Sequence, residues 1–248
     1  MSFRSTVLGA TVAILLAGGA IAAPVTPTFG TFGEIADAGV TTEFGGDGIS
    51  GANTAYDTFS DESGNQLTLG LTITPRFGAA PTPANDGAGT FTVQPGLATP
   101  PGSSFEGTLW NFSFFGGLTP ADGQDIDIAD IGLELLYDLD SAAGTDTDDL
   151  GSINLSYFAL PDQDVSEGSQ NLNFSFLSDG TPGVTPGLNT FDPNAGEYSF
   201  LLRATNFADG SGVVAVQTNV APVPLPAGLP LLLAGLGGLA FLRQRKAA

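Results

Sequence analysis

Histidine and cysteine are missing from this sequence of 248 residues, and only six Lys and Arg stand against 26 Asp and Glu. The absence of His excludes a Ser-His-Asp triad, a Cys-His pair and His-ligated zinc. The absence of Cys excludes disulfides and thiolate chemistry. Because the single Lys is Lys246, in the C-terminal tail, a buried lysine nucleophile in the body of the chain is excluded as well.

Cations are scarce throughout the central part of the chain. Every acid lies between Glu34 and Asp209, and only Arg76 and Arg203 lie among them. Phosphate contacts require clustered Lys and Arg, so nucleic acid is not expected as a partner. The remaining ionisable groups leave carboxylate-based hydrolysis, calcium binding or no chemistry.

Apolar residues are abundant enough to build a core. Hydrophobic residues make up 42% of the chain and include 18 Phe, so a disordered chain is not expected despite the formal charge of −20. The length suits one domain flanked by two terminal segments. We expect this domain to span residues 23–221.

Residues 1–22 have the three parts of a secretory signal peptide. Arg4 is followed by an apolar run over residues 7–17 and by Ala20-Ile21-Ala22. Ala20 and Ala22 satisfy the small-residue cleavage rule and predict Ala23 as the mature N-terminus. Export from the cytoplasm is therefore expected.

Residues 222–248 form a second tripartite segment. An apolar stretch over residues 228–242 and a basic end over residues 243–246 follow five motif residues, which are Val223, Pro224, Leu225, Pro226 and Ala227. The stretch is short beside the roughly 20 residues of a stable membrane span, and its Pro and Gly weaken a helix. We expect a short transmembrane helix that is inserted transiently, with the basic end in the cytoplasm. A simple tail anchor is the alternative.

This C-terminal segment resembles the VPLPA variant of the PEP-CTERM sorting signal in its motif, its Gly- and Leu-rich helix and its basic end. The resemblance implies a protein exported from a Gram-negative bacterium. An exosortase-type membrane protease would recognise residues 223–227 and cut nearby, so that the protein passes from the inner membrane to the cell surface or the medium. The resemblance also implies a link to exopolysaccharide. The motif residues would then be recognised by another enzyme rather than act as catalytic groups.

Between the two terminal segments the pattern is that of β-strands separated by Gly, Pro, Asn and Asp turns. The clearest alternation places Leu67, Leu69, Leu71 and Ile73 on one face of a strand over residues 66–74. Further strands are expected over residues 55–60, 89–94, 104–115, 131–138, 152–160, 171–178, 197–205 and 212–220. The pattern predicts an all-β, antiparallel β-sandwich or jelly-roll-like body, with one short helical turn over residues 119–130.

One local pattern occurs three times, over residues 110–115, 153–158 and 172–177. Each segment places apolar residues at its first, third and fifth positions and Asn and Ser at its second and fourth. In strands, these two sets point to opposite faces. If the strands were neighbours, the Asn and Ser side chains would form a polar strip suited to sugar hydroxyls; ordinary solvent-facing residues are the alternative.

Two segments of the body are similar to the uncharacterised bodies that accompany VPLPA tails. They are Tyr137-Asp138-Leu139-Asp140, followed by a Gly-containing loop, and Glu167-Gly168-Ser169-Gln170-Asn171-Leu172 before a Phe-rich segment. The resemblance supports membership of this group and implies no activity.

The densest acidic loop lies over residues 138–149. Calcium prefers six to eight hard oxygen ligands, and this loop offers five carboxylates, from Asp138, Asp140, Asp146, Asp148 and Asp149. The loop does not follow the EF-hand pattern, and neither does a second acidic segment over residues 122–127. A solvated acidic loop is the alternative, so calcium is the only cofactor that the sequence suggests and no cofactor is certain.

A carboxylate glycosidase would need a pair of acids such as the strand-placed Glu106, Glu134 and Glu197, each of which fits an edge or solvent-facing position equally well. Nothing in the sequence selects a pair among them, so no catalytic residue is assigned and an enzyme is not expected. We expect an exported, exosortase-processed surface or extracellular-matrix protein with a structural or interaction role, linked to exopolysaccharide. A calcium-dependent polysaccharide-binding module is the alternative.

Overall fold

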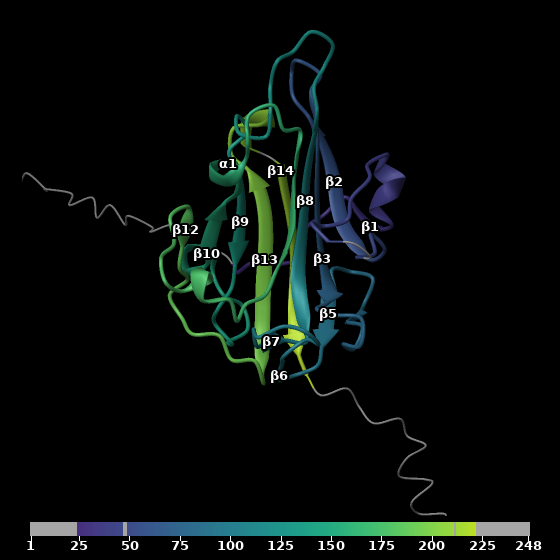
Figure 1. The fold of residues 1–248 in the computed structure, drawn as a ribbon. Helices are drawn as coiled ribbons and strands as arrows, with labels where there is room; N and C mark the ends of the chain where they lie inside the picture. The colour runs from purple at the N-terminus through teal and green to yellow at the C-terminus, as the bar shows by residue number, and fades with distance from the viewer. Residues whose placement is uncertain (1–23, 47–48, 211, 222–248) are drawn as a thin grey trace, which may run out of the picture.

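The computed structural model describes residues 24–46, 49–210 and 212–221, and most of their regular structure is β (Figure 1). A five-stranded sheet has the order β1-β2-β3-β8-β11. Its strands are β1 (Thr31–Gly33), β2 (Thr54–Ser60), β3 (Gln66–Pro75), β8 (Trp110–Thr119) and β11 (Val165–Gln170).

A seven-stranded sheet has the order β12-β10-β9-β13-β14-β5-β4. Its strands are β4 (Ala84–Asn85), β5 (Thr90–Val93), β9 (Leu133–Tyr137), β10 (Gly151–Asn154), β12 (Val184–Thr185), β13 (Gly196–Ala204) and β14 (Gly212–Val220). A small separate ribbon joins β6 (Leu97–Ala98) to β7 (Gly107–Thr108).

The two large sheets face each other across one apolar core (Figure 1). The alternating residues of β3 that were predicted to share a face, Leu67 to Ile73, all enter this core. Phe112 of β8 stacks on Phe200 of β13 with ring centroids 4.6 Å apart, and Trp110 meets Phe200 edge-on at 6.3 Å. Aromatic contacts of this kind join the two sheets through their middle.

The predicted antiparallel pairing is wrong for one pair of strands. Among the described residues, neighbouring strands run antiparallel except β14 and β5, which run parallel from Gln217↔Thr90 to Val220↔Val93. β5 enters the seven-stranded sheet from a hairpin with β4, after the chain has left β3 in the opposite sheet. Its direction is set by this crossover, which no local pattern reveals.

Six of the predicted strands are confirmed with small shifts of their ends: β2, β3, β5, β9, β13 and β14. The strand predicted over residues 104–115 begins later, at Trp110, and continues to Thr119. The helical turn predicted over residues 119–130 is wrong. Thr119 belongs to β8, and the residues after it form turns without a helix.

Two predicted strands are wrong in whole or in part. The strand over residues 152–160 ends at Asn154, where α1 (Leu155–Phe158) begins, and the segment over residues 171–178 contains a 3-10 helix, η3 (Ser175–Leu177). The strand of that region is β11, which lies earlier in a polar segment without apolar alternation. The other short helices are η1 (Ile35–Ala38), η2 (Thr147–Asp149) and η4 (Ala208–Gly210).

No helix within the described residues is long and apolar enough to cross a membrane. The predicted signal peptide, with Ala20 and Ala22, and the predicted sorting signal over residues 222–248 lie outside the described residues.

Candidate functional site

The acidic loop after β9 begins with a buried carboxylate. Asp138 is 1% exposed, and its oxygens accept hydrogen bonds from the backbone N–H groups of Asp140 at 2.8 Å and Ser199 at 3.4 Å. Burial raises the pKa of Asp138 to about 6, although these hydrogen bonds and one from Thr145 oppose the rise. Asp138 therefore joins the loop to β13 by accepting hydrogen bonds.

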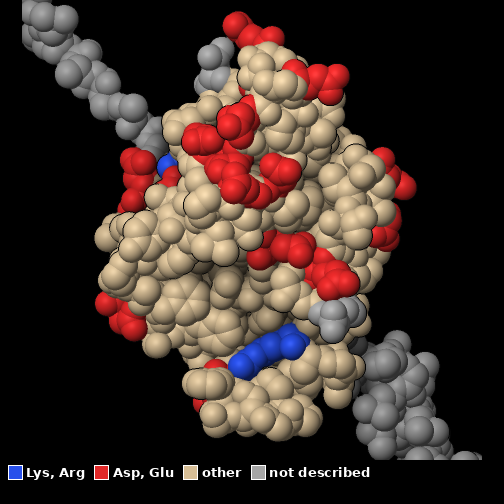
Figure 2. Space-filling model, turned by 45° about the horizontal axis from the view of Figure 1, so that its top comes forward, with Lys and Arg blue, Asp and Glu red and all other residues tan. Residues whose placement is uncertain are grey.

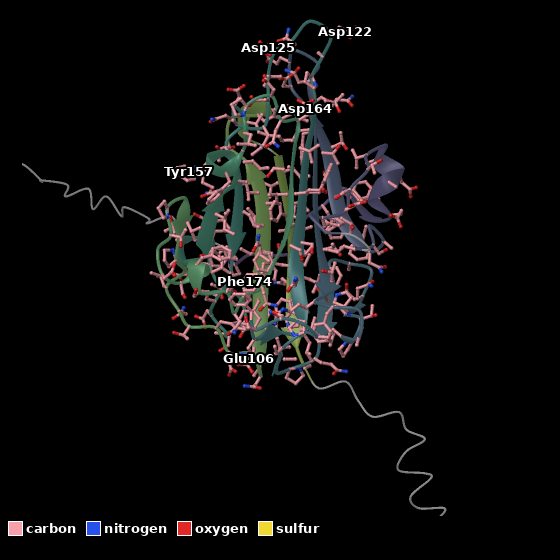
Figure 3. All side chains as sticks on the ribbon, viewed as in Figure 1. Glu106, Asp122, Asp125, Tyr157, Asp164 and Phe174 are labelled. Carbon is pink, nitrogen blue, oxygen red and sulfur yellow. The ribbon has the colours of Figure 1, made fainter. Side chains whose placement is uncertain are left out.

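Of the other four predicted calcium ligands, Asp140 lies beside Asp138 and donates its backbone N–H to it. Asp140 accepts hydrogen bonds from the Ala142 N–H and from Asn189 Nδ2, and Asp146 precedes η2, which contains Asp148 and Asp149. Among the described residues, no three acidic side chains are placed so that they could hold a metal ion. Asp122 and Asp125, from the second acidic segment, lie at a loop tip at the top of the molecule (Figure 3).

The three acids that were predicted to lie in strands do not come together, and Glu106 lies before β7 rather than in a strand. Glu134 pairs with Arg203 across β9 and β13, with Oε2 2.7 Å from the arginine Nη2, and Glu197 accepts a hydrogen bond from the Gly144 N–H. Because Glu134 lies beside Arg203, six residues of β13 separate it from Glu197, which corresponds to roughly 20 Å. The two carboxyl groups of a glycosidase are separated by no more than about half that distance. Glu106 lies near the opposite end of the molecule from the acidic loop tips (Figure 3).

The polar strip does not form as predicted, because only the first of its three segments is a strand over its whole length. A polar cluster does cover part of the outer face of the five-stranded sheet. Ser113 Oγ lies 3.0 Å from both Thr74 Oγ1 and Ser169 Oγ, and Asn111 Nδ2 donates to Ser169 Oγ at 3.0 Å. These side chains come from β3, β8 and β11, and they bond chiefly to one another.

Asn171 closes this cluster at the end of β11. Its side chain is fully buried, and its Nδ2 lies 2.8 Å from three acceptors, which are Thr108 Oγ1, the Trp110 carbonyl oxygen and Asn111 Oδ1. Its Oδ1 accepts a hydrogen bond from the Thr108 N–H at 3.1 Å. Since the donors and acceptors of the cluster are used internally, we read the cluster as structural.

A first cavity, of about 450 Å³, borders this polar face beside Thr72, Thr74 and Arg76. The guanidinium of Arg76 donates to the carbonyl oxygens of Ala98 and Phe105, at 3.0 and 2.9 Å, and lies over the ring of Phe174. Arg76 thus fastens the loop that carries β6 and β7 to the end of β3. Its hydrogen bonds go to the protein itself rather than to a ligand.

A second and larger cavity, of about 710 Å³, lies between β11 and the segment formed by β10 and α1. We call it the edge cavity. Its lining combines apolar side chains such as Phe114, Ile153 and Phe158 with Ser166 and Gln170. It opens where β11 ends the five-stranded sheet, facing the end of the seven-stranded sheet that carries β12.

Aromatic side chains stand exposed beside the edge cavity. Tyr157 and Phe158 are 61% and 51% exposed, and their rings meet edge-on at 5.2 Å. Tyr157 projects from α1 on the flank of the molecule (Figure 3). Sequence reasoning missed this site because it assigned residues 153–158 to a strand; the adjacent pair of aromatic residues was the one available signal.

Carboxylates are spread over the surface with little positive charge between them (Figure 2). Arg76 and Arg203 are the only Lys or Arg among the described residues, and both are engaged as described above. No family model, no curated protein and no solved structure matches this chain.

Proposed function

We propose that this chain is an exported surface or extracellular-matrix protein of a Gram-negative bacterium, processed at its C-terminus by an exosortase-type protease, with a structural or interaction role linked to exopolysaccharide. We also propose that its two facing sheets are a β-sandwich, in keeping with their shared core. The observation that carries the proposal is that the packed body begins after the predicted signal-peptide cleavage site and ends before the predicted sorting motif.

Packing at the N-terminal side of the body supports removal of a signal peptide. The chain is packed into the body from Val25 onward. Val25 is 4% exposed, and its N–H donates to the Thr145 carbonyl oxygen at 3.2 Å. Gln217 Nε2 donates to the Val25 carbonyl oxygen at 2.7 Å. The predicted cleavage after Ala22 would therefore leave every one of these contacts intact.

Packing at the C-terminal side is consistent with the same proposal. β14 ends at Val220, and the Ala221 N–H donates to the Val93 carbonyl oxygen at 3.0 Å. The predicted sorting motif begins at Val223, directly after this last contact. A protease could cut at the motif without removing any described strand.

Fractionation of the producing cells tests the proposal. An antibody against the body should detect a protein outside the cytoplasm that has lost both predicted terminal segments, as measured by intact-mass spectrometry. Replacing Pro224 and Pro226 by Ala should leave export intact and retain the full C-terminus in the membrane fraction. Release of wild-type protein with an intact C-terminus would refute processing at the motif.

Calcium dependence stays a prediction. The carboxylates of Asp138 and Asp140 already accept hydrogen bonds from the protein, so binding at this loop would require rearrangement. Calorimetry with calcium chloride, repeated on the Asp148→Asn, Asp149→Asn double variant, would detect such a site.

A further inference from the structure

The edge cavity joins an apolar floor to polar groups that have no partner in the fold. Phe114 and Ile153 belong to opposite sheets and supply the floor. Among the described residues, the side chains of Ser166 and Gln170 have no hydrogen-bond partner, in contrast to the closed polar cluster around Asn171. Cavities of this size and mixed lining are typical of sites for small molecules or for one short stretch of a polymer.

The rings beside the cavity are held in an exposed position by the backbone. A Cβ on Gly183 would lie 2.6 Å from Tyr157 Cδ1 and 3.0 Å from Phe158 Cζ, so both rings rest directly against this glycine. Asn154 Oδ1 accepts a hydrogen bond from the Tyr157 N–H at 3.0 Å and fixes the start of α1. Two large rings that pack on backbone and still face solvent form a ready surface for a partner.

An added β-strand is a poor fit to this edge. The segment over residues 42–46 already lies against the middle of β11, where Glu167 accepts hydrogen bonds from the N–H groups of Glu43 and Phe44. A Cβ on Gly45 would lie 3.0 Å from the Cα of Gly168. This segment therefore crowds the middle of β11, so the cavity favours a ligand other than an extended peptide.

The charges near the edge cavity disfavour an anionic ligand. No Lys or Arg lines the edge cavity, and the two described arginines are engaged elsewhere. Asp164 lies directly before β11, and Glu167 lies within it. An anionic ligand would meet repulsion without any compensating cation. A ligand with hydroxyl groups, an apolar face and no negative charge meets the groups present.

We propose that the edge cavity, with the rings of Tyr157 and Phe158, binds a neutral polysaccharide. The apolar C–H face of a sugar ring would stack on the exposed aromatic faces, whose partial negative charge attracts those hydrogens. Ser166 and Gln170 would hydrogen-bond to hydroxyl groups. The inference rests on the proposed function for its extracellular setting, and it adds the location of the site and the charge class of the polymer.

Native gel electrophoresis in polymer-containing gels tests this inference, because the acidic protein migrates readily toward the anode. The probes are three neutral polymers, dextran, laminarin and galactomannan, with alginate as the acidic polymer. The protein purified from the producing cells should be retarded by at least one neutral polymer and not by alginate. Phe158→Ala and Tyr157→Ala should each weaken that retardation on the order of tenfold, through loss of stacking area.

Matched variants test whether retardation by a neutral polymer depends on the edge cavity. Phe105→Ala removes a ring that is 73% exposed and lies outside the edge cavity, so it should leave retardation unchanged. Gln170→Ala should weaken binding without altering the emission of the buried Trp110. The proposal is overturned if no neutral polymer retards the protein, if only alginate does, or if Phe105→Ala weakens binding as much as Phe158→Ala.

An apolar probe separates a sugar site from a site for lipid-like molecules. If the dye ANS binds the cavity and no neutral polymer displaces it, the edge cavity is not a polysaccharide site. Failure of the binding test with correct export and trimming would overturn this inference alone. Retention of an untrimmed chain in the cytoplasm would overturn the proposed function, whatever the outcome of the gels.

Discussion

The segments Trp110–Phe115 and Ile153–Phe158 share one sequence pattern and adopt different structures. The first lies in β8, between β3 and β11, and its Trp110 and Phe112 are buried in the core. The second leaves β10 at Asn154, forms α1 and presents two rings to solvent. An alternating pattern becomes a strand where a partner strand is there to pair with it. We call the buried parts of the two sheets and of the loops that join them the closed region, and α1 with the edge cavity the open region.

The partner strand explains why the second segment turns. Asn154 pairs with Glu134, and β9 begins only one residue before Glu134, at Leu133. Beyond this point Ser156 Oγ accepts a hydrogen bond from the Leu133 N–H and donates to the Ile128 carbonyl oxygen. With no strand left to pair, the backbone satisfies its polar groups within a helical turn.

The largest effect is expected in the closed region, at Phe200. Phe200→Ala removes a fully buried ring that stacks on Phe112 and meets Trp110, so the free energy of unfolding should fall by about 3–5 kcal/mol. Urea unfolding followed by the fluorescence of the single tryptophan measures it. Phe200→Leu is the control and should lose clearly less. An equal loss in both variants would argue against the ring contacts as the cause.

A smaller loss is expected from the polar part of the closed region. Asn171→Ala leaves the Thr108 N–H without its acceptor and removes one of the two hydrogen bonds to the carbonyl oxygen of Trp110, which keeps the one from Thr108 Oγ1, all in a buried setting. The free energy of unfolding should fall by about 2–3 kcal/mol. Asn173→Ala, which loses one exposed hydrogen bond to the Glu106 carbonyl oxygen, is the matched control and should change little. Similar losses in the two variants would contradict a special role for Asn171.

In the open region the expected effect is smaller again. Asn154→Ala removes the hydrogen bond to the Tyr157 N–H that starts α1, which should cost about 1 kcal/mol, whereas Asn154→Ser should retain most of it. Hydrogen exchange at the Tyr157 amide reports the loss directly. Unchanged exchange in Asn154→Ala would show that packing on Gly183, rather than the cap, holds this turn.

The last expected effect is a change in pH dependence, rather than a loss of stability at one pH, at the buried acid of the closed region. Burial raises the pKa of Asp138 from 3.8 to about 6, so the folded protein binds this proton more tightly than the unfolded chain. This contribution to stability is fully present below the lower value and is lost as the pH rises to the upper one. Asp138→Asn should therefore show a smaller decline in its unfolding midpoint across this range. Parallel pH profiles of the parent and the variant would contradict the raised pKa.

Much of the body could be predicted because strand patterns are local. The alternation at residues 67–73 and the run at residues 212–220 match β3 and β14 closely. β11 was not predicted because its residues are mostly polar, and it is a strand only through its pairing with β8. The edge cavity was not predicted because its lining comes from segments that are distant in sequence.

By itself, the sequence determined which His- and Cys-based chemistry is excluded and the β character of the body, since composition and local period are properties of short stretches of chain. Only the tertiary structure decided which acids pair and which are buried, because Glu134 meets Arg203, and Asp138 meets Ser199, across strands far apart in sequence. It also decided that one aromatic pair stacks in the core while Tyr157 and Phe158 face solvent. The physical reason is that the free energy of a side chain depends on the neighbours that folding brings to it, and many of those neighbours are distant in sequence.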